Sequence, residues 1–544
     1  MSATAAGPGR QTLVGSVRAA YAACVILFGG AVTQFYAPAT GFTSLISIGD
    51  AINERQVTQL RQVPHYVYEN SAGYDGAYYV QLALNPTLQN PELKSAIDNL
   101  PYRARRILFC WVAWLAGLGR PDWIVQAHAL LNVASWLALA GVLLRWFPAT
   151  SWENFFRWFG VMFSHGLCMS VRDSLVDGPS LLLVALALAA WEDGRRWRAT
   201  ALLALAGLGR ETSLLAVAGL ETRDQRPETK DRGIRRFRSL VSNLWSMVLR
   251  AAPAALPLVA WVLFLRWKFG PLDETGLNNF ALPFADFAKK WGATIGGLMH
   301  PDDPWLEWAT LAATAALTVQ ALFFALRWRP RELWWRVGAT YGGLMLVLAT
   351  PVWEGFPGAA TRVLLPMTLA FNVLVPCGGR WLAVLIAGNL TVVAAFMEFT
   401  PPSPEFYELR GDQIALRALR VERTGGWYGA ENASGMKWRW SSGQSGLRLR
   451  NTSGGPLTVI CAGRAAAALD ERRLRISVGE AVVWSGKLKG QPVTFQFGLT
   501  LPSGETVLSF ATDKPGHPVG TDLRQLAFEI LNLEIVVRPA AGQR

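Results

Sequence analysis

Long apolar runs recur along most of the chain and stop near residue 400. They begin at Val17 and continue to Met397, and examples are Gly178–Trp191 and Trp381–Met397. A helix needs about 20 apolar residues to cross the hydrocarbon layer of a bilayer, and a large soluble core rarely repeats such runs so often. The pattern therefore predicts a polytopic α-helical membrane domain over residues 1–400.

Beyond the proline-rich stretch TPPSP at 400–404, apolar residues alternate with polar ones. The alternating runs are separated by clusters of Gly, Ser and Asn, and they are Leu447–Arg450, Leu474–Val478, Val493–Phe497 and Leu533–Ile535. A period of two is typical of half-buried strands. Residues 401–544 are therefore predicted to form a separate β-sandwich with Greek-key or jelly-roll connections.

Tryptophans in this tail have two possible roles. Aromatic rings can stack on sugar rings, or they can fill the core of the sandwich. The core role is favoured, although carbohydrate binding by the tail stays open. The residues concerned are Trp427, Trp438, Trp440 and Trp484.

Charge supports the membrane prediction and orients it. Only 17% of the residues are charged, against about 25% in ordinary soluble proteins. Lys and Arg gather in short connections, which usually face the cytoplasm. Together with the N-terminus they place the C-terminal domain on the outer side of the membrane, periplasmic or extracellular. The sign of the net charge of +13 says little by itself, because the location of the charges matters; no nucleic-acid partner is expected. The basic connections are 145–157, 192–198, 223–250, 327–336 and Arg380.

Two apolar segments must stop short of crossing if all basic connections are to face the cytoplasm. Ile107–Gly119 is short and is expected to lie at the outer interface. Ala199–Leu220 carries Arg210 and Glu211 at its centre, so it is expected to form two half-spans that bring these charges to a cavity. This threading predicts about 11 crossings. Its outer loops are about 38–106, 172–177, 266–304 and 350–362.

Cysteine and histidine offer little chemistry. The five Cys are scattered, and only Cys461 lies well inside the tail, so no internal disulfide framework is expected there. The His residues show no metal-ligand spacing. No metal site is predicted from the sequence.

The first outer loop contains the most suggestive motif, Ser71–Val80. Asp75 is flanked by Gly73 and Gly76 inside an aromatic cluster that includes Tyr74 and Tyr79. Glycines allow a tight turn and a close approach to the carboxylate, and aromatic side chains offer platforms for sugar rings or lipid headgroups. Asp-Gly is also an ordinary turn signal, so a purely structural role carries about equal weight.

The other outer loops also carry acidic and basic residues. A base with cationic phosphate ligands would need such groups at one membrane depth. Each could instead be a helix cap or an interfacial anchor, and for Asp177, just before Gly-Pro, capping is favoured. The residues are Arg172, Asp173, Asp177, Arg210, Glu211, Glu354 and Arg362.

These motifs resemble the GT-C superfamily of integral-membrane glycosyltransferases, especially bacterial mannosyltransferase-like members. The resemblance covers about residues 15–400 and is most specific in GYDGAYYVQLALNP (73–86) with PYRARRIL (101–108). GLGRETSLL (207–215) and ATRVLLP (360–366) support it. It implies a polyprenyl-phosphate-linked sugar donor, a glycan or glycoconjugate acceptor outside the cytoplasm, and inversion at the anomeric carbon.

The resemblance also implies roles for individual residues. Asp75 matches the family's general base, while Arg362, with Arg210 or Arg103, would stabilise the leaving phosphate. The other candidate substrate-binding residues are Tyr74, Gly76, Tyr79, Asp173, Glu211 and Glu354. Many members follow the catalytic acid with a second acid, where this chain has Gly76. The second carboxylate and any divalent metal are therefore left open, and no cofactor is assigned.

Two other functions remain compatible with the sequence. A transporter or flippase of lipid-linked glycans would also have many crossings, buried charges and a broken helix, although the sequence shows no inverted repeat. A non-catalytic membrane protein could bind envelope polysaccharide through its outer sandwich. Only the glycosyltransferase needs a base at Asp75.

Overall fold

A computed structural model describes residues 8–68, 71–220, 234–270, 276–299, 303–355, 357–402, 406–411, 413–433, 436–520 and 522–539. The chain forms two compact units. The first comprises Met1–Gln34, Leu45–Arg61 and Val67–Thr400, and the second comprises Phe35–Ser44, Gln62–Tyr66 and Pro401–Arg544. Two pieces of the predicted first outer loop are thus grouped with the C-terminal residues, which the sequence did not indicate.

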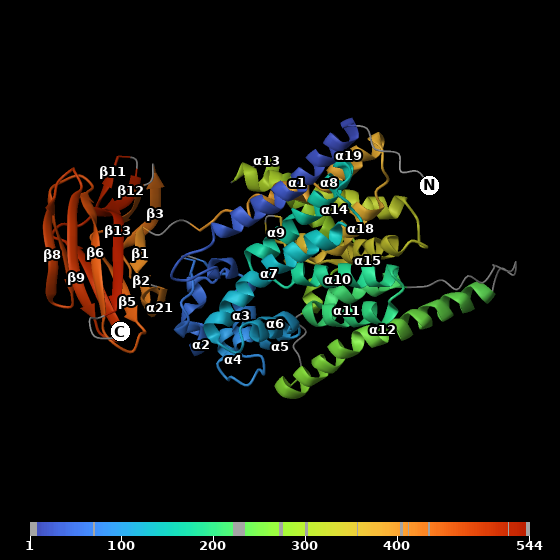
Figure 1. Cartoon of the computed structure of the whole chain (residues 1–544), viewed down its shortest axis with the longest axis horizontal. Coiled ribbons are helices and arrows are strands. Elements are labelled where there is room, and N and C mark those ends of the chain that lie inside the picture. Colours follow the sequence, from blue (N-terminus) through green and yellow to red (C-terminus); the bar gives the residue numbers. More distant parts are fainter. Residues whose placement is uncertain are drawn as a thin grey trace. The chain divides into compact units, whose positions relative to one another are not determined.

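The first unit is helical (Figure 1). Its helices are α1 (Pro8–Thr33), α2 (Thr58–Gln62), α3 (Gly76–Leu84), α4 (Leu93–Ala96), α5 (Leu100–Ala104), α6 (Leu108–Ala116), α7 (Pro121–Leu143), α8 (Trp152–Met162), α9 (His165–Arg172), α10 (Asp177–Glu192), α11 (Arg196–Gly209), α12 (Ile234–Phe269), α13 (Ala285–Met299), α14 (Pro304–Leu326), α15 (Leu333–Val347), α16 (Thr350–Trp353), α17 (Ala360–Val363), α18 (Leu365–Leu374), α19 (Gly379–Gly388) and α20 (Thr391–Ala395). Short 3-10 helices are η1 (Thr43–Ile46), η2 (Asp50–Arg55), η3 (Glu211–Leu220) and η4 (Leu277–Asn279).

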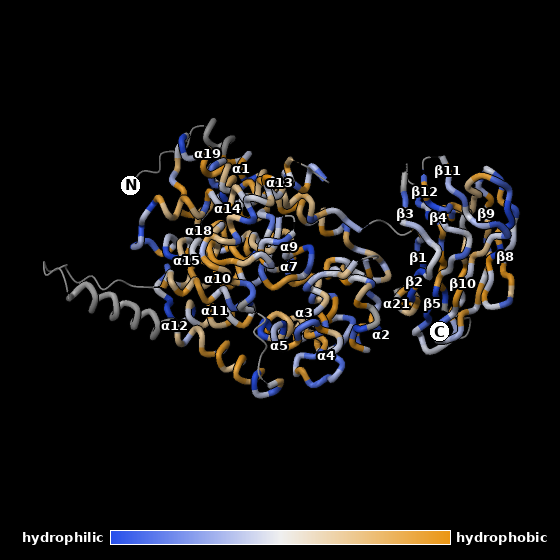
Figure 2. The backbone as a smooth tube through the Cα atoms, turned by 180° about the vertical axis from the view of Figure 1, so that it is seen from behind, coloured by the Kyte–Doolittle hydropathy of each residue, from blue (hydrophilic) through white to orange (hydrophobic). Residues whose placement is uncertain are grey.

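Apolar residues dominate several of these helices, including α10, α15 and α18 (Figure 2). Among the described residues, four helical segments are long and apolar enough to cross a membrane: Val14–Thr33, Pro121–Leu143, Ala252–Phe269 and Pro304–Leu326. Other apolar helices are shorter, such as α10 with 16 residues. The predicted number of 11 crossings is therefore not confirmed, and part of the basic connection 223–250 lies outside the described residues.

The two segments that were expected to stop short of crossing differ in structure: one is a short helix and the other is broken in the middle. α6 has nine residues, fewer than half of the ~20 that a crossing needs. α11 ends at Gly209, Arg210 is extended, and η3 begins at Glu211. Gly207 lies against the side chain of Leu214, so the chain turns sharply at this break. The break at Arg210 is where the sequence predicted it.

The C-terminal residues form two main sheets, as the alternating pattern predicted. A six-stranded sheet has the order β3-β4-β13-β6-β9, with β1 paired to β13; a five-stranded sheet has the order β2-β5-β10-β7-β8. All neighbours are antiparallel except β1 and β13. The elements are β1 (Tyr407–Gly411), α21 (Gln413–Ala418), β2 (Leu419–Arg423), β3 (Trp427–Ala433), β4 (Met436–Ser441), β5 (Gln444–Asn451), β6 (Leu457–Ala467), β7 (Arg472–Val478), β8 (Ala481–Leu488), β9 (Val493–Leu501), β10 (Gly504–Thr512), β11 (His517–Val519), β12 (Asp522–Leu526) and β13 (Phe528–Pro539).

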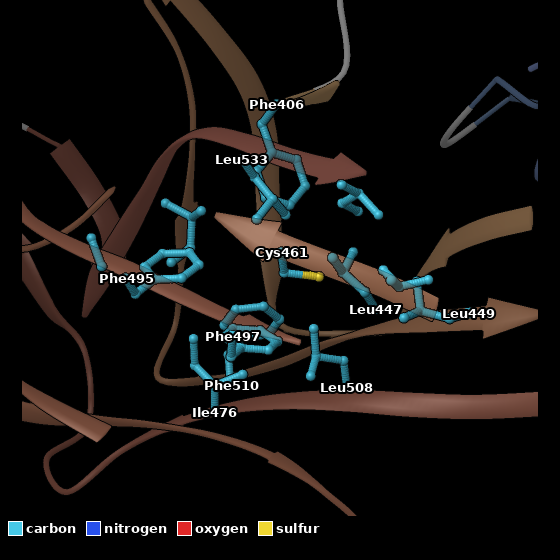
Figure 3. Packing of buried hydrophobic residues seen from close by; sticks show 14 of the residues in the cluster. Phe406, Leu447, Leu449, Cys461, Ile476, Phe495, Phe497, Leu508, Phe510 and Leu533 are labelled. Carbon is cyan, nitrogen blue, oxygen red and sulfur yellow. The ribbon is translucent and has the colours of Figure 1, made fainter. Parts of the chain in front are cut away.

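Side chains from both sheets meet in one hydrophobic core. Figure 3 shows Cys461 and Phe497 from one sheet close to Leu447 and Ile476 from the other. Cys461 is a buried thiol that forms no disulfide with any described residue. Facing apolar surfaces of two antiparallel sheets are what defines a β-sandwich.

The tryptophans of the tail divide into two pairs. Trp427 and Trp484 pack against the core, which is the role the sequence favoured for all four. Trp438 and Trp440 alternate along β4 with the buried Arg439 and Ser441, so they point away from the core. All four are half-buried, so their exposure alone does not separate a carbohydrate-binding role from a core role.

Candidate functional site

Asp75 directly precedes α3 and lies where two distant segments meet. Gly73 has φ +71°, a conformation that favours glycine, and its backbone packs on that of Ser47. Gly76 packs so closely on the Asp173 carbonyl that a Cβ atom would collide with it. These contacts bring the predicted first outer loop onto the 172–177 turn. The glycines of the motif therefore have a structural role that also sets the position of Asp75.

Arg103 holds the Asp75 carboxylate. Its Nη1 lies 2.9 Å from Asp75 Oδ1, and its Nη2 lies 2.8 Å from Asp98 Oδ2. The side chain of Asp75 is 24% exposed. Burial raises the pKa of the Asp75 carboxyl, but the charges of Arg103, Arg362 and Arg106 outweigh it and hold the pKa below its usual value. Asp75 is therefore an ionised, partly accessible carboxylate near three arginines.

A second group of charges centres on Asp177, the first residue of α10. Its Oδ2 lies 3.2 Å from Arg362 Nη1, and its Oδ1 is paired with Arg210. Arg362 Nη2 also donates to the Tyr74 hydroxyl at 2.9 Å. The preference for a capping role at Asp177 was wrong: Val176 is the N-cap residue, and the Asp177 carboxylate binds two arginines instead.

Arg362 keeps one donor without a partner. Its side chain is 7% exposed, and its Nε is buried with no hydrogen-bond partner among the described residues. A buried, unpaired N–H is costly, and an anionic oxygen is the kind of partner that a guanidinium binds best. The arrangement around Arg362 therefore suits an anionic ligand.

Arg106 lies between α5 and α6 and links this part of the chain to Glu211, at the break between α11 and η3. Its Nε lies 3.0 Å from Glu211 Oε2, and it donates to the hydroxyls of Tyr79 at 3.0 Å and Tyr102 at 2.9 Å. Sequence reasoning missed Arg106, although it lies in the quoted PYRARRIL motif. The spacing of three residues between Arg103 and Arg106 could have identified it, because that spacing places both side chains on one side of a helical turn. α3 packs against both α5 and α6 (Figure 1).

Asp173 belongs to a neighbouring group. It accepts a hydrogen bond from Ser47 Oγ at 2.6 Å, and Arg172 donates to the same Ser47 oxygen at 2.7 Å and to Tyr68 at 2.9 Å. Burial raises the pKa of the Asp173 carboxyl to about 6, against the opposing effect of Arg172. The side chain of Asp173 thus supports the turn, while its backbone supports Gly76.

Glu354 stands apart from these groups. It is exposed, and none of the ion pairs among the described residues includes it. In contrast, Glu398 was not a candidate. It pairs with His165 at 2.9 Å and is close enough to Tyr74 and Asp173 to interact electrostatically with both. Its only sequence signal was its position at the end of the last apolar run.

No three His, Cys, Asp or Glu side chains converge on a possible metal position within the described ranges. The acidic groups of the site face guanidinium groups instead. In chemical terms the site combines the partly accessible Asp75 carboxylate with several cationic donors and phenolic side chains. Such a set can accept a proton and bind a phosphate.

The chain is thus a helical protein with apolar, membrane-length helices, a polar charged site and a C-terminal β-sandwich. No protein-family model matches it, and no curated protein matches it either. Among solved structures it is similar to the cryo-EM structure of arabinosyltransferase EmbB from Mycobacterium smegmatis, at 13% identity and a TM-score of 0.33. The match covers 98% of this chain but only 65% of that one. At these values the likeness decides neither fold nor activity.

Proposed function

We propose that this protein is a GT-C-type membrane glycosyltransferase that moves a sugar from a polyprenyl-phosphate donor to an acceptor outside the cytoplasm. The acceptor would be a cell-envelope glycan or glycoconjugate at a bacterial plasma membrane. One observation carries the proposal: Asp75, beside membrane-length helices, lies within electrostatic reach of Arg103, Arg106 and Arg362. A base and phosphate ligands are the two functions that such a transfer needs.

The acceptor hydroxyl would be activated by Asp75. As the acceptor oxygen bonds to the anomeric carbon, the bond from that carbon to the phosphate oxygen breaks, and the hydroxyl proton passes to the carboxylate. A carboxylate with a low pKa is a weak base, so the proton moves late, when the attacking oxygen has become acidic. Direct displacement inverts the anomeric centre and needs no covalent enzyme intermediate.

The leaving polyprenyl phosphate would be stabilised by arginine. Arg362 offers its unpaired Nε, and Arg210 shares the Asp177 carboxylate with it. Guanidinium groups bind phosphate oxygens through two hydrogen bonds at once, and they hold their charge at all physiological pH values. A bound phosphate would also offset the positive charges near Asp75, which would raise the basicity of that carboxylate. Donor binding would thus prepare the base.

The test uses the purified full chain with polyprenyl-phosphate pentoses and hexoses and a set of oligosaccharide acceptors. Asp75→Asn should lower the transfer rate by at least about 100-fold, because the amide cannot accept the proton. Asp98→Asn is the matched control, since Asp98 also pairs with Arg103 but is more exposed, at 45% against 24% for Asp75. Full turnover by Asp75→Asn would refute the mechanism.

A second pair of variants tests the phosphate ligand. Arg362→Ala should raise the KM for the donor at least about tenfold, because a charge-assisted contact is lost. The exposed Arg380 provides the control, and Arg380→Ala should leave the KM unchanged. If the protein moves the lipid-linked sugar across a vesicle membrane but transfers no sugar to an acceptor, the result would favour the transporter instead.

A further inference from the structure

His165 joins two segments that border the proposed phosphate site. It is the first residue of α9 and is 2% exposed. Its Nδ1 lies 2.8 Å from Thr361 Oγ1, and its Nε2 lies 2.9 Å from Glu398 Oε1. Both ring nitrogens are thus engaged, one by α17 and the other by the chain just beyond α20. The mechanism above uses neither His165 nor Glu398.

The contact between His165 and Thr361 fixes the part of α17 that carries Arg362, the next residue. Thr361 Oγ1 lies 2.8 Å from His165 Nδ1 and 3.0 Å from Gly358 O. A neutral imidazole that donates its Nε2–H to the Glu398 carboxylate accepts at Nδ1 from the Thr361 hydroxyl. Next to His165, Gly166 packs directly on the backbone of Thr361, and a Cβ atom there would lie 2.7 Å from Arg362 N. The start of α9 therefore contacts α17 in two ways: the His165 side chain binds the Thr361 hydroxyl, and the Gly166 main chain packs on the Thr361 backbone.

Arg362 has little freedom once its backbone is fixed. Its guanidinium spans Asp177 Oδ2 at 3.2 Å and the Tyr74 hydroxyl at 2.9 Å, and it lies 5.3 Å from the centre of the Tyr74 ring. A shift of α17 would strain or lengthen at least one of these contacts. The direction of the unpaired Nε would change with it.

Glu398 is the other end of the bridge. It is the last acidic residue before the TPPSP stretch, and its side chain is 16% exposed. A buried imidazole needs partners at both nitrogens, and the carboxylate supplies one of them. The bridge therefore connects the end of the first unit to the segment that carries Arg362.

We propose that His165 is a positioning residue: by bridging Glu398 to Thr361 it sets the place of Arg362, and so determines how tightly the donor phosphate binds. The inference rests on the proposed function for the identity of the ligand. It predicts that His165 affects recognition of the phosphate and leaves recognition of the lipid chain unchanged.

The experiment measures equilibrium binding of polyprenyl monophosphate and of the polyprenol of equal length to the full chain. His165→Ala and Thr361→Val should each weaken phosphate binding about five- to tenfold, the value of one lost hydrogen bond near a charged group, and leave polyprenol binding unchanged. Thr391→Val is the matched control. Thr391 is equally buried, and its hydroxyl has no hydrogen-bond partner among the described residues.

Conservative variants and a double-mutant cycle separate positioning from a general loss of structure. His165→Asn can still place an amide oxygen, an acceptor like Nδ1, near Thr361 Oγ1, so it should recover part of the affinity that His165→Ala loses. In the Arg362→Ala background, His165→Ala should cause no further loss, because its effect passes through Arg362. An equal loss in both backgrounds, or an equal loss for polyprenol, would overturn the inference.

The outcome also distinguishes this inference from the proposed function. If the wild-type protein transfers sugar but His165→Ala binds polyprenyl phosphate as the wild type does, only the inference fails. If no donor supports transfer but the phosphate still binds in a His165-dependent way, only the proposed function fails. A wild-type protein that does not prefer the phosphate over the polyprenol would overturn the inference.

Discussion

Arg103 and Asp75 form an ion pair with 2.9 Å between Nη1 and Oδ1, although Arg103 lies in α5 and Asp75 directly precedes α3. The same guanidinium binds Asp98, which is 45% exposed. Arg103 is thus held by two carboxylates with different access to solvent. Its charge is one reason why the pKa of Asp75 is low, after the opposing effect of burial is counted.

Removal of Arg103 should therefore change the pH dependence of sugar transfer. Without this positive charge the pKa of Asp75 rises, and the base is ionised only at higher pH. In Arg103→Ala the acid limb of the profile of kcat/KM against pH should move to higher pH. The measurement is the initial transfer rate across about pH 4 to 9, a range that spans the titration of carboxyl groups.

Asp98→Asn is the control for this shift. It leaves Arg103 in place and removes a competing partner, so the acid limb should stay where it is or move slightly to lower pH. If Arg103→Ala leaves the acid limb unchanged, either Asp75 is not the base or Arg103 does not act on it.

Gly76→Ala should disturb both stability and activity. The new methyl group would collide with the Asp173 carbonyl and lie 2.8 Å from the Ile46 carbonyl. Such overpacking costs about 1–3 kcal/mol, and relief of the strain would move Asp75 with the start of α3. Thermal unfolding in detergent and the transfer rate are the measurements.

Gly343→Ala, in α15, is the matched variant, because nothing lies within 4 Å of its added methyl group. It should be neutral or stabilise the protein by up to about 1 kcal/mol. Equal behaviour of the two variants would show that the close packing at Gly76 is unimportant.

Glu529 should make the second unit less stable as the pH rises. Burial, together with the neighbouring charge of Glu431, raises the pKa of the Glu529 carboxyl to about 7. The folded state thus favours the protonated form, and stability falls as pH increases from the usual glutamate value toward 7, then levels off. After a discount for its partial exposure, the loss amounts to about 1 kcal/mol.

Glu529→Gln should remove this loss, since the amide carries no charge. Protection of β13 amides from hydrogen exchange, compared at pH 5 and pH 8 as approximate limits of the transition, is the measurement. Glu505→Gln, on the exposed part of β10, is the control and should retain the wild-type dependence. A wild-type protein with pH-independent protection would contradict the prediction.

The predicted orientation can be tested by cysteine labelling. Arg198 and Glu354 are both exposed, and the charge pattern assigns them to opposite sides of the membrane. In a chain with the exposed Cys377 replaced by serine, a membrane-impermeant maleimide added to intact cells should label Glu354→Cys and spare Arg198→Cys. The reverse result would invert the topology and place the proposed site in the cytoplasm.

Much of the architecture was predictable because it depends on local periodicity. Uninterrupted apolar runs predicted helices, and alternation predicted strands such as β5, β7 and β9. The charged pair Arg210–Glu211 predicted a break in an apolar helix, and α11 does end at Gly209. Each of these features follows from how a short segment buries its own apolar side chains. The number of crossings did not follow, because several apolar helices are shorter than a bilayer is thick.

The sequence by itself determined that membrane-length helices precede a β-sandwich, and that charged residues occur in the connections between apolar segments. The tertiary structure decided which of those charges meet. Tyr74 binds Arg362, Asp177 binds two arginines, and Glu398 reaches His165, whereas Glu354 joins none of them. These pairings depend on close backbone packing, as at Gly76 and Gly166, between segments far apart in the chain. No local pattern encodes such contacts, because each one is set by the shapes of two surfaces that meet only when the whole unit has folded.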